Sequence, residues 1–184
     1  MKIYTKKGDQ GQTSIIGKSG LHKHDERIDA YGTVDELNTY LGLLRSFPIV
    51  KKTKYNDVII ELQKQLFKLG SYLAQSDYKQ VSNEKILITE SEILKMESEI
   101  DSISKDLPVL KSFILNGGEI VSSHIQFART ICRRSERKLT IVHQKYNIDS
   151  IWLVFINRLS DFLFVLGRYF LNKSGEEECY WKGD

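Results

Sequence analysis

Hydrophobic residues recur along this chain at the three- and four-residue spacing of amphipathic helices. Such patterns run over residues 27–47, 55–76, 90–107, 119–145 and 150–172. The first of them contains one apolar stripe, formed by Val34, Leu37, Leu41 and Leu44. A stripe of this kind is typical of a helix that packs against a core. The patterns together predict an all-α fold, a five-helix bundle with almost no strand.

Helix-breaking and capping residues mark where these elements end. The only prolines, Pro48 and Pro108, both fall between helical patterns, which favours long uninterrupted helices. Thr89 and Glu92 have the spacing of a capping box at the start of a helix. Residues 1–24 are polar and glycine-rich and predict a loop, with a short extended piece at 2–5.

The length of 184 residues suits one domain, since no repeat, linker or low-complexity tract divides the chain. We expect a single domain over 1–184, made of an N-terminal loop (1–24), a helical bundle (27–172) and a tail (173–184).

Composition narrows the class of protein. Hydrophobic residues make up 41% and charged residues 28%, with a net charge of +3, which does not by itself indicate nucleic-acid binding. Cys132 and Cys179 lie far apart and form no CxxC pair, which argues against a disulfide scaffold or structural zinc site. No signal peptide and no run of about 20 apolar residues is visible. We therefore expect a cytoplasmic protein without a membrane span.

Several familiar motifs fail on spacing or context. Gly17, Lys18 and Ser19 resemble the end of a Walker A loop, but Gln12 stands where its first glycine belongs and no buried strand precedes it. No glutamate is followed three residues later by a histidine, as di-iron bundles require. His22 and His24 lack a third ligand nearby, so a solvated loop explains them better than a metal site.

A row of arginines stands out on the fourth helical pattern. Arg129, Arg133 and Arg137 are spaced by four residues and share one helix face, with Arg134 and Glu136 beside them. Like charges at this spacing repel, so the row is either a solvated surface or a site for a polyanion such as a triphosphate. The residue chemistry alone supports both readings equally.

The N-terminal loop favours the anion site. Glycines there leave backbone amides unshielded by side chains, and hydroxyl and lysine side chains lie nearby in the sequence. Together these groups can bind phosphate oxygens. The candidate residues are Thr5, Lys6, Lys7, Gly8, Asp9, Gly11, Thr13, Ser14 and, further along, Lys23.

Polar residues within the helices leave further alternatives. Asn157, Arg158 and Asp161 interrupt an apolar helix and either join helices by hydrogen bonds or contribute to the site. The arginine row is also compatible with a helical nucleic-acid-binding module, against which the acidic Asp35 and Glu36 argue. A regulatory bundle that binds ATP without catalysis is a second alternative.

Six segments in order resemble the PduO-type cob(I)alamin adenosyltransferases (ATP:corrinoid adenosyltransferases). They span nearly the whole chain, at residues 5–13, 25–27, 30–38, 113–118, 129–137 and 157–161. The resemblance implies a homotrimer with ATP bound between subunits and the N-terminal loop around the triphosphate. It implies that the nucleotide site is completed by Arg129, Arg133, Arg134, Glu136, Arg137 and Asn157.

The resemblance also assigns catalytic roles. Asp35 would pair with Arg133 across the subunit interface, and Phe113 would lie against the corrin. The reactants would be ATP and cobalamin. Mg²⁺ would bind through ATP, and no site made of protein side chains alone is expected for it. Possible partners are a cob(II)alamin reductase and an adenosylcobalamin-dependent enzyme, and neither nucleic acid nor membrane is expected.

Two substitutions depart from the family pattern. Asn116 stands where proline is usual, which would loosen the loop that carries Phe113, and Ser135 replaces a common alanine. The tail matches only loosely, around Trp181. In the implied reaction Co(I) is the nucleophile, which agrees with the absence of a Ser/His/Asp or Cys/His constellation from the sequence.

Overall fold

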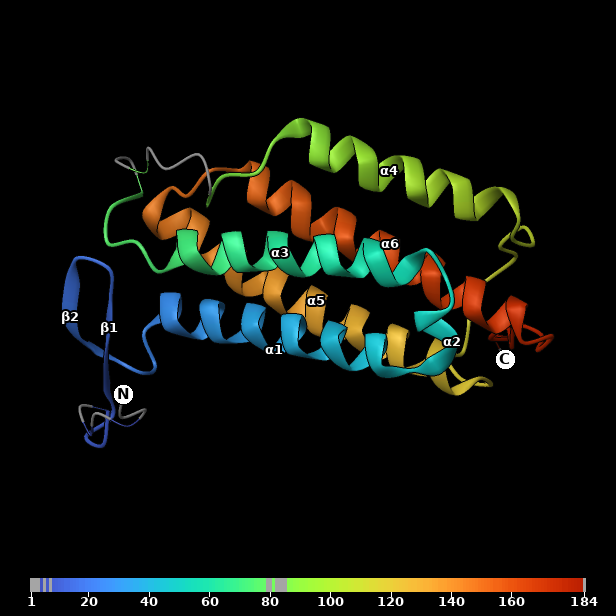
Figure 1. Cartoon of the computed structure of the whole chain (residues 1–184), viewed down its shortest axis with the longest axis horizontal. Coiled ribbons are helices and arrows are strands. Elements are labelled where there is room, and N and C mark those ends of the chain that lie inside the picture. Colours follow the sequence, from blue (N-terminus) through green and yellow to red (C-terminus); the bar gives the residue numbers. More distant parts are fainter. Residues whose placement is uncertain (1–3, 5, 7, 79–80, 82–85, 184) are drawn as a thin grey trace.

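The computed structural model describes residues 4, 6, 8–78, 81 and 86–183 (Figure 1). Within this part of the chain the helices are α1 (Glu26–Ser46), α2 (Pro48–Lys51), α3 (Tyr55–Leu73), α4 (Glu90–Lys105), α5 (Ile120–Tyr146) and α6 (Ile151–Lys173). The strands are β1 (Gln12–Ile15) and β2 (Lys18–His22). The predicted helical bundle is confirmed, and the five long helices start and end within a few residues of the predicted bounds.

The long helices pack side by side in a fixed order. α1 packs against both α3 and α5, and α6 packs against both α5 and α4. Aromatic side chains of α6 fill the centre of the bundle, and Trp152, Phe155, Phe162 and Phe170 are almost completely buried. The helices are therefore held mainly by burial of their apolar stripes, since isolated helices are only marginally stable in water.

Two short elements were not predicted. A four-residue helix, α2, begins at Pro48, because proline has no amide hydrogen to lose at the first position of a helix. The prediction of a loop over residues 1–24 is wrong for its second half, where β1 and β2 form an antiparallel hairpin. The extended piece expected at 2–5 lies largely outside the described residues.

The hairpin is fixed to the bundle by its turn. The amide of Ile16 donates to the carbonyl of Ala74 at 2.7 Å, and the amide of Ser76 donates to the carbonyl of Ile16 at 3.0 Å. The two hydrogen bonds satisfy the carbonyl of Ala74 and the amide of Ser76, which follow the last residue of α3. The helix ends at Leu73 rather than at the predicted residue 76. Figure 1 shows the hairpin beyond one end of the bundle.

Helix caps place α4 and α5. The capping box predicted at Thr89 and Glu92 is present at the start of α4. Glu119 caps α5 by accepting a hydrogen bond from the amide of Ser122 at 2.6 Å. Among the described residues, no helix combines the length and hydrophobicity needed to cross a membrane.

Candidate active site

The glycine-rich turn before the hairpin is built from backbone hydrogen bonds. Lys6 (φ 60°) and Gly11 (φ 75°) both adopt left-handed backbone conformations. The amide of Gly11 donates to the carbonyl of Gly8 at 3.2 Å, and the amide of Asp9 donates to that of Lys6 at 3.4 Å. The amides of Asp9 and Gly11, which the sequence predicted to be unshielded, are therefore occupied within the turn. An anion site here would use other amides of the same turn.

Lys23 adds a cation to the same turn. Its amide donates to the carbonyl of Gly11 at 2.9 Å. A Cβ atom at Gly8 would lie 3.3 Å from the Lys23 Nζ atom, so the lysine side chain rests against this glycine. The structure thus brings together the predicted loop residues Gly8, Gly11 and Lys23.

The remaining predicted loop residues are less close. Thr13 and Ser14 lie on β1, where Thr13 pairs with Leu21 of β2. Thr5 and Lys7 lie outside the described residues.

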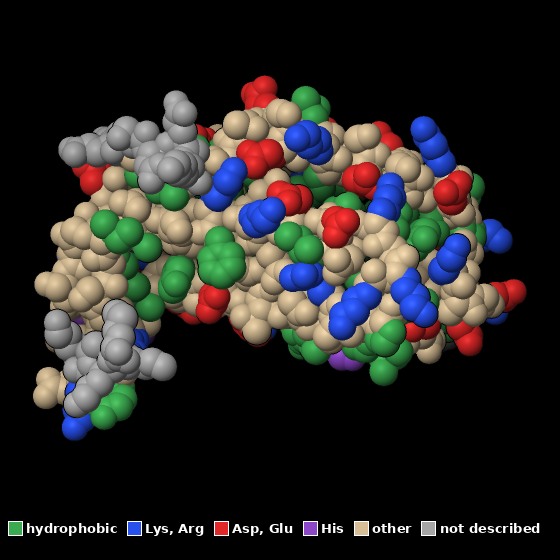
Figure 2. Space-filling view, in the orientation of Figure 1, with side chains coloured by type: hydrophobic (Ala, Val, Ile, Leu, Met, Phe, Trp, Pro, Cys, Tyr) green, Lys and Arg blue, Asp and Glu red, His purple; other side chains and the backbone are tan. Residues whose placement is uncertain are grey.

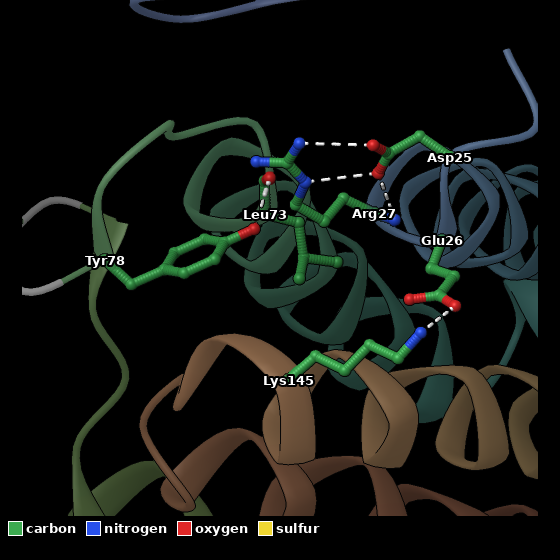
Figure 3. Close-up of polar contacts among 6 residues, drawn as sticks. All are labelled: Asp25, Glu26, Arg27, Leu73, Tyr78 and Lys145. Atoms are coloured by element: carbon green, nitrogen blue, oxygen red, sulfur yellow. Dashed lines mark hydrogen bonds and ion pairs between the residues drawn. The ribbon is translucent and has the colours of Figure 1, made fainter. Parts of the chain in front are cut away.

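An ion pair secures the junction between this loop and the bundle (Figure 3). Asp25 caps α1 and accepts hydrogen bonds from the Arg27 amide at 3.0 Å and from Arg27 Nε at 3.1 Å. The hydrogen bond from the Arg27 guanidinium lowers the pKa of the Asp25 carboxyl, although partial burial opposes this shift. The Arg27 guanidinium also lies 4.8 Å from the centre of the Tyr146 ring at the end of α5.

Two further contacts hold this end of the bundle together. The hydroxyl of Tyr78 donates to the carbonyl of Leu73 at 3.0 Å, and Lys145 pairs with Glu26. The start of α1 and the ends of α3 and α5 are therefore joined where the N-terminal loop arrives.

The arginine row follows one face of α5, as predicted. Arg129 is half-buried, whereas Arg133 and Arg137 are exposed. Within the described part of the chain, none of these three arginines forms an ion pair with a carboxylate. Burial and the neighbouring charge of Arg133 lower the pKa of Arg129. A row of cations without compensating carboxylates is a suitable binding surface for a polyanion.

The position of Arg129 is set by a neighbouring glutamine that the sequence analysis missed. Arg129 Nε donates to Gln126 Oε1 at 2.8 Å, and Gln126 Nε2 donates to the carbonyl of Phe164 on α6 at 3.2 Å. Gly167 leaves the space for this side chain, because a Cβ atom there would lie 2.4 Å from Gln126 Nε2. A glycine inside the apolar pattern of α6 was the one available signal of such a close approach.

The other residues predicted around the row are already paired. Asn157 Nδ2 donates to Glu136 Oε1 at 2.9 Å, which joins α6 to α5. Arg134 forms an ion pair of 2.5 Å with Glu36 of α1. The prediction that Asn157 joins two helices is therefore confirmed, and its contribution to the nucleotide site stays a prediction.

Phe113 and two arginines of the row, Arg129 and Arg133, border one cavity of about 570 Å³. Its walls come from the segment after α4 and from α5 and α6, and include Phe113, Arg129, Arg133, Asp161 and Phe164. The Phe113 side chain is 79% exposed. A large aromatic ring with little packing of its own, facing a cationic helix, suits an amphipathic ligand.

Asp35 lies in a different place from Arg133. It borders a second cavity, of about 160 Å³, between α1, α3 and the hairpin turn. The exposed apolar residues Ile16, Tyr31 and Phe67 lie around it, on the face of α1 and α3 where Figure 2 shows hydrophobic side chains gathered near the hairpin. Asp35 and Arg133 therefore do not meet within one chain.

Comparison with known proteins identifies the family of the chain. Residues 3–170 match the family described as cobalamin adenosyltransferase. The chain is 37% identical over 182 residues to the corrinoid adenosyltransferase of Bacillus subtilis, covering 95% of this chain and 89% of that protein. It is 36% identical over 186 residues to the corrinoid adenosyltransferase MMAB of Homo sapiens, covering 100% of this chain and 74% of the human protein.

A solved structure extends the likeness to the fold. It is a variant of the PduO-type ATP:corrinoid adenosyltransferase from Lactobacillus reuteri, complexed with cobalamin and ATP. Its TM-score with this chain is 0.91 at 37% identity, and the match covers 99% of this chain and 100% of the other. The chain therefore belongs to the cobalamin adenosyltransferase family and is a corrinoid adenosyltransferase.

Proposed function

We propose that the cavity between the arginine row and Phe113 is where the adenosyl group of ATP passes to the cobalt of a reduced corrinoid. One observation carries this assignment. Two guanidinium groups that form no ion pair within the described residues, those of Arg129 and Arg133, border the same space as an exposed aromatic ring. The first suits a triphosphate and the second suits the face of a corrin ring.

The reaction needs no nucleophile from the protein. The electron pair of Co(I) attacks the 5′ carbon of ATP, a cobalt–carbon bond forms, and the bond from that carbon to the phosphate oxygen breaks. Triphosphate leaves with the bonding electrons. The protein positions the two reactants and stabilises the charge on the leaving group.

Charge stabilisation is the role of the cationic residues. Arg129 and Arg133 would contact the triphosphate, with Arg134, Glu136, Arg137 and Asn157 completing the nucleotide site. Mg²⁺, bound through the phosphate oxygens of ATP, would neutralise part of the same charge. Arg129 is well placed for this work because Gln126 holds its guanidinium in one orientation.

Phe113 has a separate role, at the cobalt. We expect its ring to help displace the lower axial ligand of cob(II)alamin, which leaves a four-coordinate centre. Loss of an axial donor makes Co(II) easier to reduce, because axial ligation sets the potential of a metal centre. The apolar ring also excludes water from the reduced cobalt.

Residues from two copies of the chain would make one complete site. The N-terminal loop lies at one end of the bundle, whereas Arg129 and Arg133 lie along its length. Asp35 and Arg133 border different cavities. A trimer in which the exposed apolar patch around Asp35 meets the arginine row of a neighbour would bring these groups to the same ATP.

The activity is tested with ATP and chemically reduced cobalamin, so that no reductase is needed. We expect the absorption spectrum of a cobalt–carbon product and one triphosphate released per product. ATP binding without triphosphate release would favour the regulatory bundle and contradict the proposal.

The shared site is tested by mixing subunits. Asp35→Ala and Arg133→Ala should each abolish most activity alone. Co-assembly of equal amounts should restore active sites at about one quarter of the interfaces, because only one pairing in four combines both intact residues. No recovery in mixed trimers would place both residues in one subunit's site instead.

A further inference from the structure

The polar tail after α6 is folded back onto the segment that carries Phe113. The amide of Trp181 donates to the carbonyl of Phe113 at 2.8 Å, and the amide of Leu115 donates to the carbonyl of Cys179 at 2.8 Å. Ile114 and Tyr180 lie opposite each other in an antiparallel bridge. The tail therefore supplies the backbone partner of the Phe113 segment, which has no helix of its own.

One buried ion pair fixes the tail to α6. Arg168 Nε donates to Glu178 Oε1 at 2.5 Å, and Arg168 Nη2 donates to Glu178 Oε2 at 3.2 Å. Each side chain is only 9% exposed. The hydroxyl of Tyr180 also donates to the Glu178 carboxylate. Two parallel hydrogen bonds between a guanidinium and a carboxylate fix orientation as well as distance.

Arg168 also holds the beginning of the Phe113 segment. Its Nη2 atom donates to the carbonyl of Pro108 at 2.6 Å. Pro108 follows α4 by three residues and lies five residues before Phe113. A single guanidinium group therefore joins α6, the start of this segment and the tail that pairs with it.

The same arginine lies directly behind the cavity wall. The Phe164 ring centre is 5.9 Å from the Arg168 guanidinium carbon and 5.8 Å from that of Arg129. Both distances are within the range of a cation–π contact. Phe164 borders the cavity, whereas Arg168 does not.

We propose that Arg168 and Glu178 are positioning residues that hold Phe113 over the cavity by clamping the tail against its segment. The exposed Phe113 ring depends on its backbone for its direction, because successive side chains of a paired strand alternate between two faces. In keeping with this, Ile114 is half-buried while Phe113 and Leu115 are exposed. A slip of one residue in the pairing would turn the ring away.

The clamp itself does not depend on the reaction, whereas its effect on catalysis rests on the proposed function. Two measurements separate these claims, one on the free protein and one in turnover. The variant for both is Glu178→Gln, which keeps the size of the side chain and removes its charge. The matched control is Glu177→Gln, the same change at an exposed neighbour.

Hydrogen exchange of the free protein tests the clamp. In Glu178→Gln, we expect amide exchange to rise about tenfold in the peptides that cover 112–116 and 178–183, since a buried charge loses its partner. Glu177→Gln should leave both peptides unchanged. Faster exchange in the tail alone, or in neither peptide, would overturn the proposal.

Kinetics test the effect on Phe113. Starting from cob(II)alamin, with a reduced flavin supplying the one electron that Co(II) needs, Glu178→Gln should lower kcat about tenfold with the KM for ATP unchanged, because the ring acts at cobalt reduction. Starting from cob(I)alamin, kcat should stay near that of the unchanged protein. A higher KM for ATP at unchanged kcat would overturn the positioning role. If the protein without any substitution had no activity, the proposed function would be refuted, and the exchange result would still stand.

Should Glu178→Gln fail to fold, Tyr180→Phe decides the question. It removes one hydrogen bond to the Glu178 carboxylate and keeps the ion pair. We expect exchange in both peptides to rise about threefold and kcat from cob(II)alamin to fall by a similar factor. Exchange and kcat that both match the unchanged protein would overturn the proposal.

Discussion

The two walls of the cavity between the arginine row and Phe113 are held in place in different ways. Arg129 and Arg133 project from the middle of α5, a helix of 27 residues whose opposite face is buried in the core. Phe113 projects from an irregular segment that is held by a two-bond bridge to the tail and by one buried ion pair. We therefore expect the wall formed by the arginines to be rigid and the wall formed by Phe113 to be adjustable, because local stability follows the density of buried contacts.

The largest expected effect comes from removing an arginine of the rigid wall. Arg133→Ala should lower kcat/KM for ATP about a hundredfold, the usual scale for losing one hydrogen-bond donor to a transition state. Because Arg133 is exposed, thermal unfolding followed by circular dichroism should be unchanged.

Lys95→Ala is the control for this prediction, since it removes an exposed cation from α4, away from the row and from the N-terminal loop. Its kinetics should match those of the unchanged protein. Unaltered ATP kinetics in folded Arg133→Ala would remove the row from the nucleotide site.

The next effect comes from the adjustable wall. Phe113→Ala should slow the reaction from cob(II)alamin about tenfold or more, because the axial ligand stays bound and the cobalt is harder to reduce. The reaction from cob(I)alamin should change much less. Parallel assays from the two oxidation states measure the difference, and equal losses would contradict a role in reduction.

A smaller effect is expected from a change behind the rigid wall. Gly167→Ala would place a methyl group on the Gln126 amide and displace the partner of Arg129. We expect a loss of about 1–3 kcal/mol in the free energy of unfolding, as for other overpacked sites. The KM for ATP should rise as Arg129 loses its orientation.

Urea unfolding and ATP titration measure these two quantities. The matched change is Gly32→Ala in α1, where a Cβ atom would meet nothing within 4 Å. This control should be neutral or slightly stabilising, because alanine is the better helix former. A Gly167→Ala protein as stable as the control would show that Gln126 moves without cost.

The smallest effect is a pH dependence of the clamp. Burial raises the pKa of Glu178, but hydrogen bonds from Arg168 and Tyr180 outweigh it, and the net pKa lies below the ordinary 4.5. A carboxyl with a lowered pKa in the folded state stabilises that state above its unfolded pKa. The clamp should thus be intact above about pH 4.5 and weaken as the pH falls further.

Acrylamide quenching of tryptophan fluorescence follows this change. Trp152 is fully buried and Trp181 is 54% exposed, so the quenched fraction reports on the tail. Quenching should increase on acidification in the unchanged protein and vary less in Glu178→Gln. The same acid response in both proteins would assign it to other carboxyl groups.

The sequence alone predicts those parts of the fold and of the candidate site that depend on local periodicity. The five long helices follow from their apolar stripes, and the Arg129–Arg133 row follows from its four-residue spacing. The hairpin was missed because it is held by the contact of Ile16 with the end of α3, which no local pattern encodes. The clamp was missed for the same reason, since Arg168 joins α6 to Pro108, 60 residues earlier in the chain.

Resemblance supplied what periodicity could not. Phe113 has no distinguishing pattern around it, and its assignment came only from the order of the six family segments. The separation of Asp35 from Arg133 in one chain likewise could not be derived from spacing, because it depends on how α1, α3 and α5 are packed.

The two thiols of this chain differ in a way that makes the tail experimentally accessible. Cys132 is buried in α5, and burial raises the pKa of its thiol far above the usual range, so it should resist alkylation. Cys179 is exposed and lies between Glu178 and Tyr180. A maleimide dye or spin label should therefore attach at one position without any engineering, and would report tail movements as each reactant is added.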